Sequence, residues 1–102
     1  PFHCPLMQPA ADKLKVELDK IEIKDAQIPV FANVTANPVT SGSEIKDLLV
    51  KQVTSPVLWE DSVKKMVADG ITNFVEVGPG KVLSGLIKKI DRNIDTKTYL
   101  DI

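Results

Sequence analysis

The 102-residue sequence has few of the residues that build disulfides, metal clusters or nucleic-acid surfaces. Its single cysteine, Cys4, excludes an internal disulfide, and one cysteine with one histidine, His3, is too little for a zinc cluster. Aromatic residues make up 5% of the chain, and 13 basic residues are interleaved with 14 acidic ones, so we expect no nucleic-acid surface. No apolar run approaches the ~20 residues of a membrane span, and no leader peptide is evident. We therefore expect a cytoplasmic protein without a metal ion.

The remaining composition is that of an ordinary soluble domain. Hydrophobic residues make up 43% and charged residues 26% of the chain, with a net charge of −1. This length suffices for one small core. The chain begins at Pro1 rather than methionine, which we interpret as a piece of a longer protein.

The spacing of apolar residues predicts four helices. They are expected at residues 7–21, from a cap at residue 41 to about residue 52, at 59–67 and at 82–90. Ser41 followed by Glu44 forms a capping box, and Gly70 is placed to close the third helix. Gly85, inside the fourth, suggests close packing against another backbone.

Three short β-rich segments are expected at residues 28–34, 74–77 and 98–100. Strands that alternate with helices favour an α/β fold with parallel strands, and the last two strands have the spacing of a right-handed βαβ crossover. Parallel sheets are normally covered on both faces. Three strands are a thin sheet, so we expect an incomplete sheet with an exposed apolar face where upstream strands would pack.

Few residues could carry chemistry. His3 could act as a general base, since imidazole is the side chain most often used for proton transfer in catalysis, although a lone histidine is more often an ordinary residue. A Cys4 nucleophile is disfavoured, because adjacent side chains rarely reach one reacting atom. The turn at residues 78–80 precedes a helix and could hold an anion, or could simply be a tight turn.

Four segments taken together resemble one family. They are residues 2–7 (FHCPLM), 31–36 (FANVTA), 52–59 (QVTSPVLW) and 74–86 (FVEVGPGKVLSGL). In this order they are similar to the malonyl-CoA:acyl carrier protein transacylases of bacterial fatty acid synthesis. The resemblance covers nearly the whole chain and implies roughly the last third of such an enzyme.

The resemblance implies a ping-pong transfer of a malonyl group from malonyl-CoA to the phosphopantetheine thiol of acyl carrier protein, without a cofactor. His3 aligns with the histidine that takes the proton from a nucleophilic serine. The backbone carbonyl of Gln52 aligns with the acceptor that fixes the tautomer of that histidine. Phe2 and Val82 align with positions that line the substrate pocket. A phenylalanine before the histidine accompanies malonyl rather than methylmalonyl selectivity in related acyltransferases. Cys4 replaces a frequent serine and is expected to be structural.

Several parts of the family pattern are absent from this sequence. It has no Gly-His-Ser-x-Gly elbow and no ferredoxin-like subdomain, and its arginine, Arg92, lies in the wrong segment to bind malonate. The glutamine of the oxyanion hole, which the resemblance places near the native N-terminus of the enzyme, is also missing. The resemblance thus implies that residues 1–102 form the C-terminal segment of a hydrolase-like, three-layer α/β subdomain. Such a chain would be inactive without the missing N-terminal part.

Two alternatives remain open at this point. The first is an acyltransferase domain of a polyketide synthase or multidomain fatty acid synthase, which shares the same signatures. The second is a non-catalytic fragment that binds acyl carrier protein through lysines. The candidates are Lys13, Lys15, Lys64, Lys65, Lys88 and Lys89.

Overall fold

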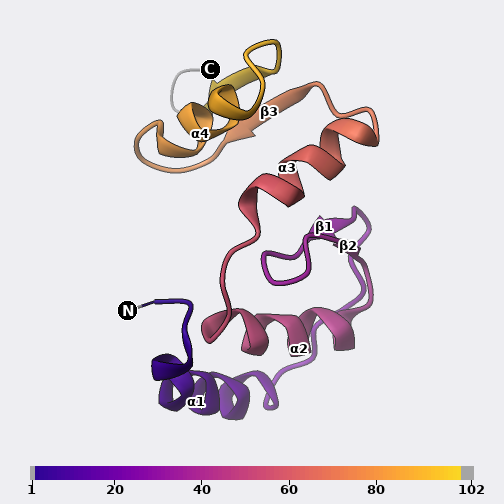
Figure 1. Ribbon diagram of the computed structural model, residues 1–102. Helices are drawn as coiled ribbons and strands as arrows, with labels where there is room; N and C mark the ends of the chain where they lie inside the picture. The colour runs from indigo at the N-terminus through magenta and orange to yellow at the C-terminus, as the bar shows by residue number, and fades with distance from the viewer. Residues whose placement is uncertain (1, 100–102) are drawn as a thin grey trace. The chain divides into compact units, whose positions relative to one another are not determined.

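The computed structural model describes residues 2–99, and the chain divides into two compact units, Pro1–Ser62 and Val63–Ile102 (Figure 1). The first unit contains η1 (Pro5–Met7), α1 (Gln8–Leu18), β1 (Val30–Phe31), β2 (Pro38–Val39), α2 (Gly42–Val53) and the start of α3 (Trp59–Ala68). The second contains the rest of α3, β3 (Asn73–Glu76), α4 (Val82–Ile90) and β4 (Asp95–Thr98). The α/β fold and the four α-helices expected from the sequence are confirmed.

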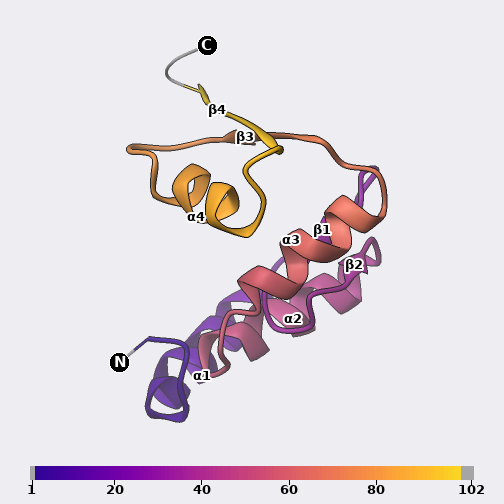
Figure 2. The same cartoon turned by 45° about the horizontal axis from the view of Figure 1, so that its top comes forward.

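In the first unit, α1 and α2 lie side by side, as Figures 1 and 2 both show. Ser41 begins α2 as predicted, because its hydroxyl accepts the backbone N–H of Glu44 at 3.4 Å. The side chain of Lys46 donates to the carbonyl of Ile21 at 2.7 Å, which ties α2 to the chain that leaves α1.

Gly42 allows the segment between α1 and β1 to pass directly over the start of α2. Its backbone N–H donates to the carboxylate of Asp25 at 2.8 Å. A Cβ atom at this position would lie 1.8 Å from the carbonyl oxygen of Ile23. Only glycine therefore fits here, and the close approach expected at Gly85 occurs instead at Gly42.

The strand expected at residues 28–34 is short and pairs in an unexpected direction. β1 is antiparallel to β2, with Val30 opposite Val39, so the expectation of parallel strands is wrong for this pair. The cause is a tight reversal between them, in which the N–H of Ala32 bonds the carbonyl of Asn37 at 3.1 Å. Ala36, buried in this turn, has a positive φ of 56°.

In the second unit, α3 ends as predicted at Gly70, which has φ 99°. The N–H of Ile71 bonds the carbonyl of Met66, and the N–H of Gly70 bonds that of Val67, both at 3.0 Å. These two bonds form the Schellman motif, for which glycine is the favoured residue.

β3 and β4 are parallel and are joined through α4, which confirms the βαβ connection. Figure 2 shows α4 on one side of this strand pair, where Ile87 and Ile94 are buried. β4 lies earlier than the expected strand at 98–100, whose residue 100 is outside the described residues.

The second unit leaves apolar surface on its strand pair. Val75 on β3 is 51% exposed and Val77 just after it is 76% exposed. Such surface agrees with the expectation of an incomplete sheet. Gly85 does not pack closely, since no atom of the described residues would lie within 4 Å of a Cβ there. No helix within residues 2–99 has the length and apolarity to cross a membrane.

Candidate functional site

His3 and Gln52, which are 49 residues apart in the sequence, meet through a hydrogen bond. The ring Nδ1 lies 2.9 Å from the backbone carbonyl oxygen of Gln52. A carbonyl oxygen can only accept, so Nδ1 carries the proton and donates it. Nε2 is then the unprotonated nitrogen of the neutral ring. The contact therefore selects the tautomer in which Nε2 can accept a proton from a third group.

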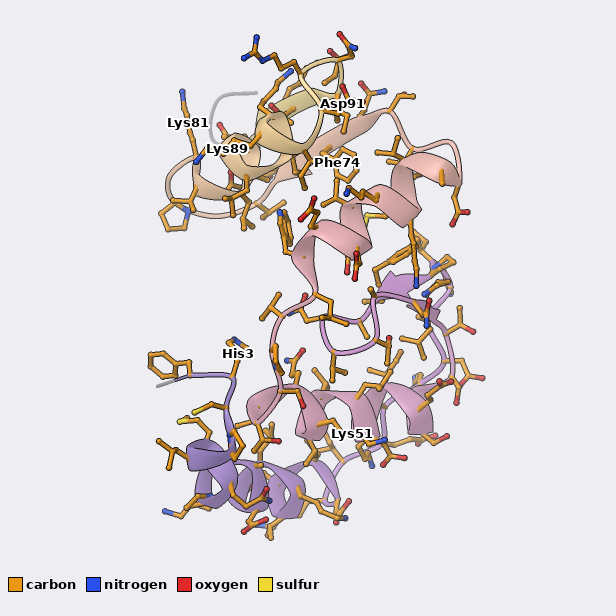
Figure 3. All side chains as sticks on the ribbon, viewed as in Figure 1. His3, Lys51, Phe74, Lys81, Lys89 and Asp91 are labelled. Carbon is orange, nitrogen blue, oxygen red and sulfur yellow. The ribbon has the colours of Figure 1, made fainter. Side chains whose placement is uncertain are left out.

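The backbone at His3 is turned into the left-handed region. Its φ is 56°, a conformation that costs a residue with a Cβ on the order of 1 kcal/mol. Immediately afterwards Cys4 begins η1, and its carbonyl accepts the N–H of Met7 at 3.0 Å. The turn leaves the His3 side chain exposed, as Figure 3 shows for the labelled ring. Strained backbone of this kind is common where a side chain has a function.

Gln52 lies in the last turn of α2, where helix carbonyls lack intrahelical partners. The preceding carbonyl, of Lys51, accepts the hydroxyl of Ser55 at 2.8 Å and that of Thr54 at 3.4 Å. The carbonyl of Gln52 is 3.4 Å from the N–H of Ser55, which is a long contact, and it receives the ring of His3. The two hydroxyls were not singled out from the sequence, although Ser and Thr before a proline are common helix ends.

An apolar cavity of about 220 Å³ lies beside Gln52 within the first unit. Side chains from β1, β2 and α2 line it, among them Phe31, Val39 and Leu48, and its polar members are Asn33 and Gln52. Asn33 also anchors the next segment, because its carbonyl accepts the N–H of Leu58 at 2.8 Å.

The remaining predicted site residues are placed as follows. Phe2 adjoins His3 and is 79% exposed, and Cys4 is half-buried at the start of η1. Val82 is the first residue of α4, in the second unit, and is 72% exposed. The structure thus brings His3 and Gln52 together and places Val82 in a different unit. No cluster of three metal-ligating side chains occurs among residues 2–99.

The turn at residues 78–80 is not an open anion site. The carboxylate of Glu76 already accepts the backbone N–H groups of Leu83 and Ser84, at 3.2 and 2.9 Å. The hydrogen bond from the Ser84 N–H lowers the pKa of the Glu76 carboxyl, and the bonds from the Ser84 hydroxyl and the Leu83 N–H lower it further. Partial burial of the carboxyl opposes them by raising the pKa, but the hydrogen bonds prevail. The tight-turn interpretation is therefore the correct one, with positive φ at Gly78 and Gly80.

Comparison with known proteins agrees with the resemblance in the motifs. A malonyl CoA-acyl carrier protein transacylase from Bacillus subtilis (strain 168) is 53% identical over 101 residues, which are 99% of this chain and 32% of the relative. The crystal structure of an acyl carrier protein S-malonyltransferase from Vibrio cholerae matches with a TM-score of 0.93 and 43% identity, over 100% of this chain and 33% of that one. The chain is a homologue of the malonyl CoA-acyl carrier protein transacylases.

A further solved structure bears on the partners of these transacylases. It is described as a type II PKS acyl-carrier protein in complex with its malonyl-transacylase, and it matches with a TM-score of 0.92 and 40% identity, over 100% of this chain and 33% of that one. No family model matches the chain. The chain spans about a third of the length of the curated transacylases that it matches.

Proposed function

We propose that this chain is part of an enzyme that moves a malonyl group from malonyl-CoA to the phosphopantetheine thiol of acyl carrier protein. In this proposal residues 1–102 are the C-terminal segment of its hydrolase-like subdomain, and the chain supplies the histidine. The contact that carries the proposal is the 2.9 Å hydrogen bond between His3 Nδ1 and the Gln52 carbonyl. It gives an exposed imidazole in the tautomer that a general base requires.

The reaction runs in two acyl transfers. Nε2 of His3 takes the proton of a serine hydroxyl, supplied from outside these residues, as the serine oxygen attacks the thioester carbonyl. The C–S bond breaks, and the protonated ring gives its proton to the departing thiolate of coenzyme A. The phosphopantetheine thiol then reverses these steps with the malonyl-serine ester. Protons and acyl groups balance without a cofactor.

The position of Gln52 matters more in this mechanism than its side chain. Its carbonyl belongs to the C-terminal end of α2, where helix dipoles leave partial negative charge. When the His3 ring gains a proton, its positive charge is stabilised by the partial negative charge at this end of the helix. Unlike a carboxylate, the carbonyl orients the ring without adding a full charge.

Substrate choice is assigned to Phe2 and Val82. Phe2 precedes His3 directly, so its ring would lie near the acyl group that the serine carries. In this proposal it fills space that an α-methyl group would need, and Val82 contributes packing to the pocket. One methyl group is worth only ~1–3 kcal/mol of discrimination, so the selectivity is a preference.

The test is malonyl transfer by the complete gene product that contains this chain. We expect His3→Ala to lower kcat by about 10²–10⁴-fold, as for loss of a general base. Gln52→Ala, which keeps the carbonyl, should change kcat by less than about threefold, and Cys4→Ser serves as a neighbouring control. Full activity in the His3→Ala enzyme, or turnover by the 102-residue chain alone, would reject the proposal.

The alternatives make different predictions. The length of the gene product that contains this chain would distinguish a multidomain synthase from a discrete transacylase. A non-catalytic carrier-binding fragment would tolerate His3→Ala and lose binding at raised salt. Lys15 pairs with Asp19 at 3.0 Å, and Lys88 donates to the carbonyl of Arg92 at 3.3 Å. Lys64 and Lys65 also interact with other groups of the protein. The transfer reaction is therefore the better supported proposal, in a cytoplasmic enzyme that acts on an acyl carrier protein.

A further inference from the structure

At the end of α2, two neighbouring backbone carbonyls accept hydrogen bonds from two different kinds of donor. The carbonyl of Lys51 receives the hydroxyl of Ser55 at 2.8 Å, and the carbonyl of Gln52 receives the ring of His3 at 2.9 Å. Both groups belong to the last turn, where the backbone donors are distant: the N–H of Thr54 lies 3.3 Å from the Lys51 oxygen, and that of Ser55 lies 3.4 Å from the Gln52 oxygen. The Ser55 hydroxyl therefore makes the shortest bond to the first carbonyl, and the His3 ring makes the shortest bond to the second.

The residues that follow α2 account for the bond between the Ser55 hydroxyl and the Lys51 carbonyl. Pro56 disfavours helical backbone at the residue before it, so the helix must end by Ser55. A serine four residues after a helical carbonyl can return its hydroxyl to that carbonyl. Thr54 donates to the same oxygen, but at 3.4 Å its bond is the weaker one.

Without the Ser55 hydroxyl, the Lys51 carbonyl would keep only the longer bonds from the N–H and hydroxyl of Thr54, at 3.3 and 3.4 Å. The N–H of Ser55 already makes a long hydrogen bond of 3.4 Å to the Gln52 oxygen, beside the shorter bond from the ring. If the turn relaxed, the last peptide groups of α2 would rotate, and the Gln52 carbonyl would turn away from the imidazole. The ring would then lose the fixed acceptor that sets its tautomer.

We propose that Ser55 is a positioning residue for His3: its hydroxyl holds the Lys51 carbonyl and so keeps the Gln52 carbonyl directed at the imidazole. This inference rests on the proposed function, because it assumes that the tautomer of His3 matters for catalysis. Ser55 does not touch the ring in this account and acts only through the helix end.

The experiment compares Ser55→Ala and Ser55→Thr in the complete gene product. Ser55→Ala should lower kcat roughly tenfold, as expected for a displaced catalytic group, with KM for malonyl-CoA nearly unchanged. Ser55→Thr keeps a hydroxyl and should restore most of the rate. Ser43→Ala is the matched control, because it removes a hydroxyl from the first turn of the same helix, where it lies 3.1 Å from the Ser41 hydroxyl.

A direct measurement separates positioning from general stability. In nitrogen-15 histidine spectra, the Nδ1–H signal of His3 should broaden or shift in Ser55→Ala and return in Ser55→Thr. Ser43→Ala should leave that signal and kcat unchanged. Unaltered kcat and an unaltered Nδ1–H signal in Ser55→Ala, or a loss that Ser55→Thr fails to restore, would overturn the inference.

The two proposals fail in different ways. If His3→Ala retains full activity, the proposed function is wrong whatever Ser55 does. If His3→Ala is inactive while Ser55→Ala behaves as the parent enzyme, only the role of Ser55 is refuted.

Discussion

The carboxylate of Glu76, at the end of β3, accepts both the backbone N–H and the hydroxyl of Ser84 in α4, each at 2.9 Å. The residue at the ordinary N-cap position, Lys81, makes no side-chain cap bond. The strand thus caps the helix that follows it, across the turn at residues 78–80. A charged acceptor is favoured here, because the N-terminal end of a helix carries partial positive charge.

This cap predicts a stability that depends on pH. Because the folded pKa of Glu76 is lowered, its contribution is present above the ordinary glutamate pKa and is lost as the pH falls through the folded value. We expect Glu76→Gln to melt at a lower temperature than the parent protein at neutral pH. The difference should shrink toward zero in acid, since the parent carboxylate is then protonated as well.

Thermal melts followed by circular dichroism from neutral pH to about pH 3 would measure this effect. Glu22→Gln is the control, because it removes the same charge from an exposed site between α1 and β1. A difference between Glu76→Gln and the parent that stays constant over this range would contradict the charged cap.

The features that sequence reasoning predicted are those encoded over short distances. Helix α4 was expected at its observed bounds, because its apolar residues recur at helical spacing up to Ile90. Gly70 and Ser41 likewise mark helix ends through their own backbone or side chain. The link between His3 and Gln52 spans 49 residues, and spacing alone could not give it; it came from the family resemblance.

The features that were missed depend on pairing or on distant partners. β2 contains only Pro38 and Val39, too short for a strand signal, and its proline favoured a loop. β4 has the polar sequence of Asp95–Thr98, without the apolar residues that mark a buried strand. The cap joins Glu76 to Ser84 across a turn, so the local sequence around either residue does not predict it.

Gly42→Ala should be strongly destabilising. The new Cβ would lie 1.8 Å from the Ile23 carbonyl oxygen and 2.7 Å from its carbon, and both are backbone atoms that cannot rotate away. Overpacking of this kind costs about 1–3 kcal/mol, and a backbone clash belongs at or above the upper end. Urea unfolding of the complete gene product would measure the loss. Stability equal to the parent would show that the segment at Ile23 can move aside freely.

Gly85→Ala should have the opposite effect. Gly85 lies inside α4, and a Cβ there would meet no atom of the described residues within 4 Å. Alanine loses less conformational entropy in a helix, so we expect a gain of about 0.5–1 kcal/mol in the same urea measurement. A loss in the complete gene product would contradict this expectation and favour the close backbone contact first expected at Gly85.

Phe2→Ser should relax the choice between malonyl and methylmalonyl substrates. If the Phe2 ring occupies the space of an α-methyl group, removing it should raise kcat/KM for methylmalonyl-CoA relative to malonyl-CoA by roughly tenfold. Competition between the two thioesters, with the acyl carrier protein products separated by mass, gives this ratio directly. Phe2→Tyr keeps the ring and should leave the ratio near that of the parent.

Since Phe2 is 79% exposed, its removal should leave the melting temperature almost unchanged. A ratio that stays constant in Phe2→Ser, with the enzyme folded and active, would remove Phe2 from the specificity pocket while leaving the role of His3 intact.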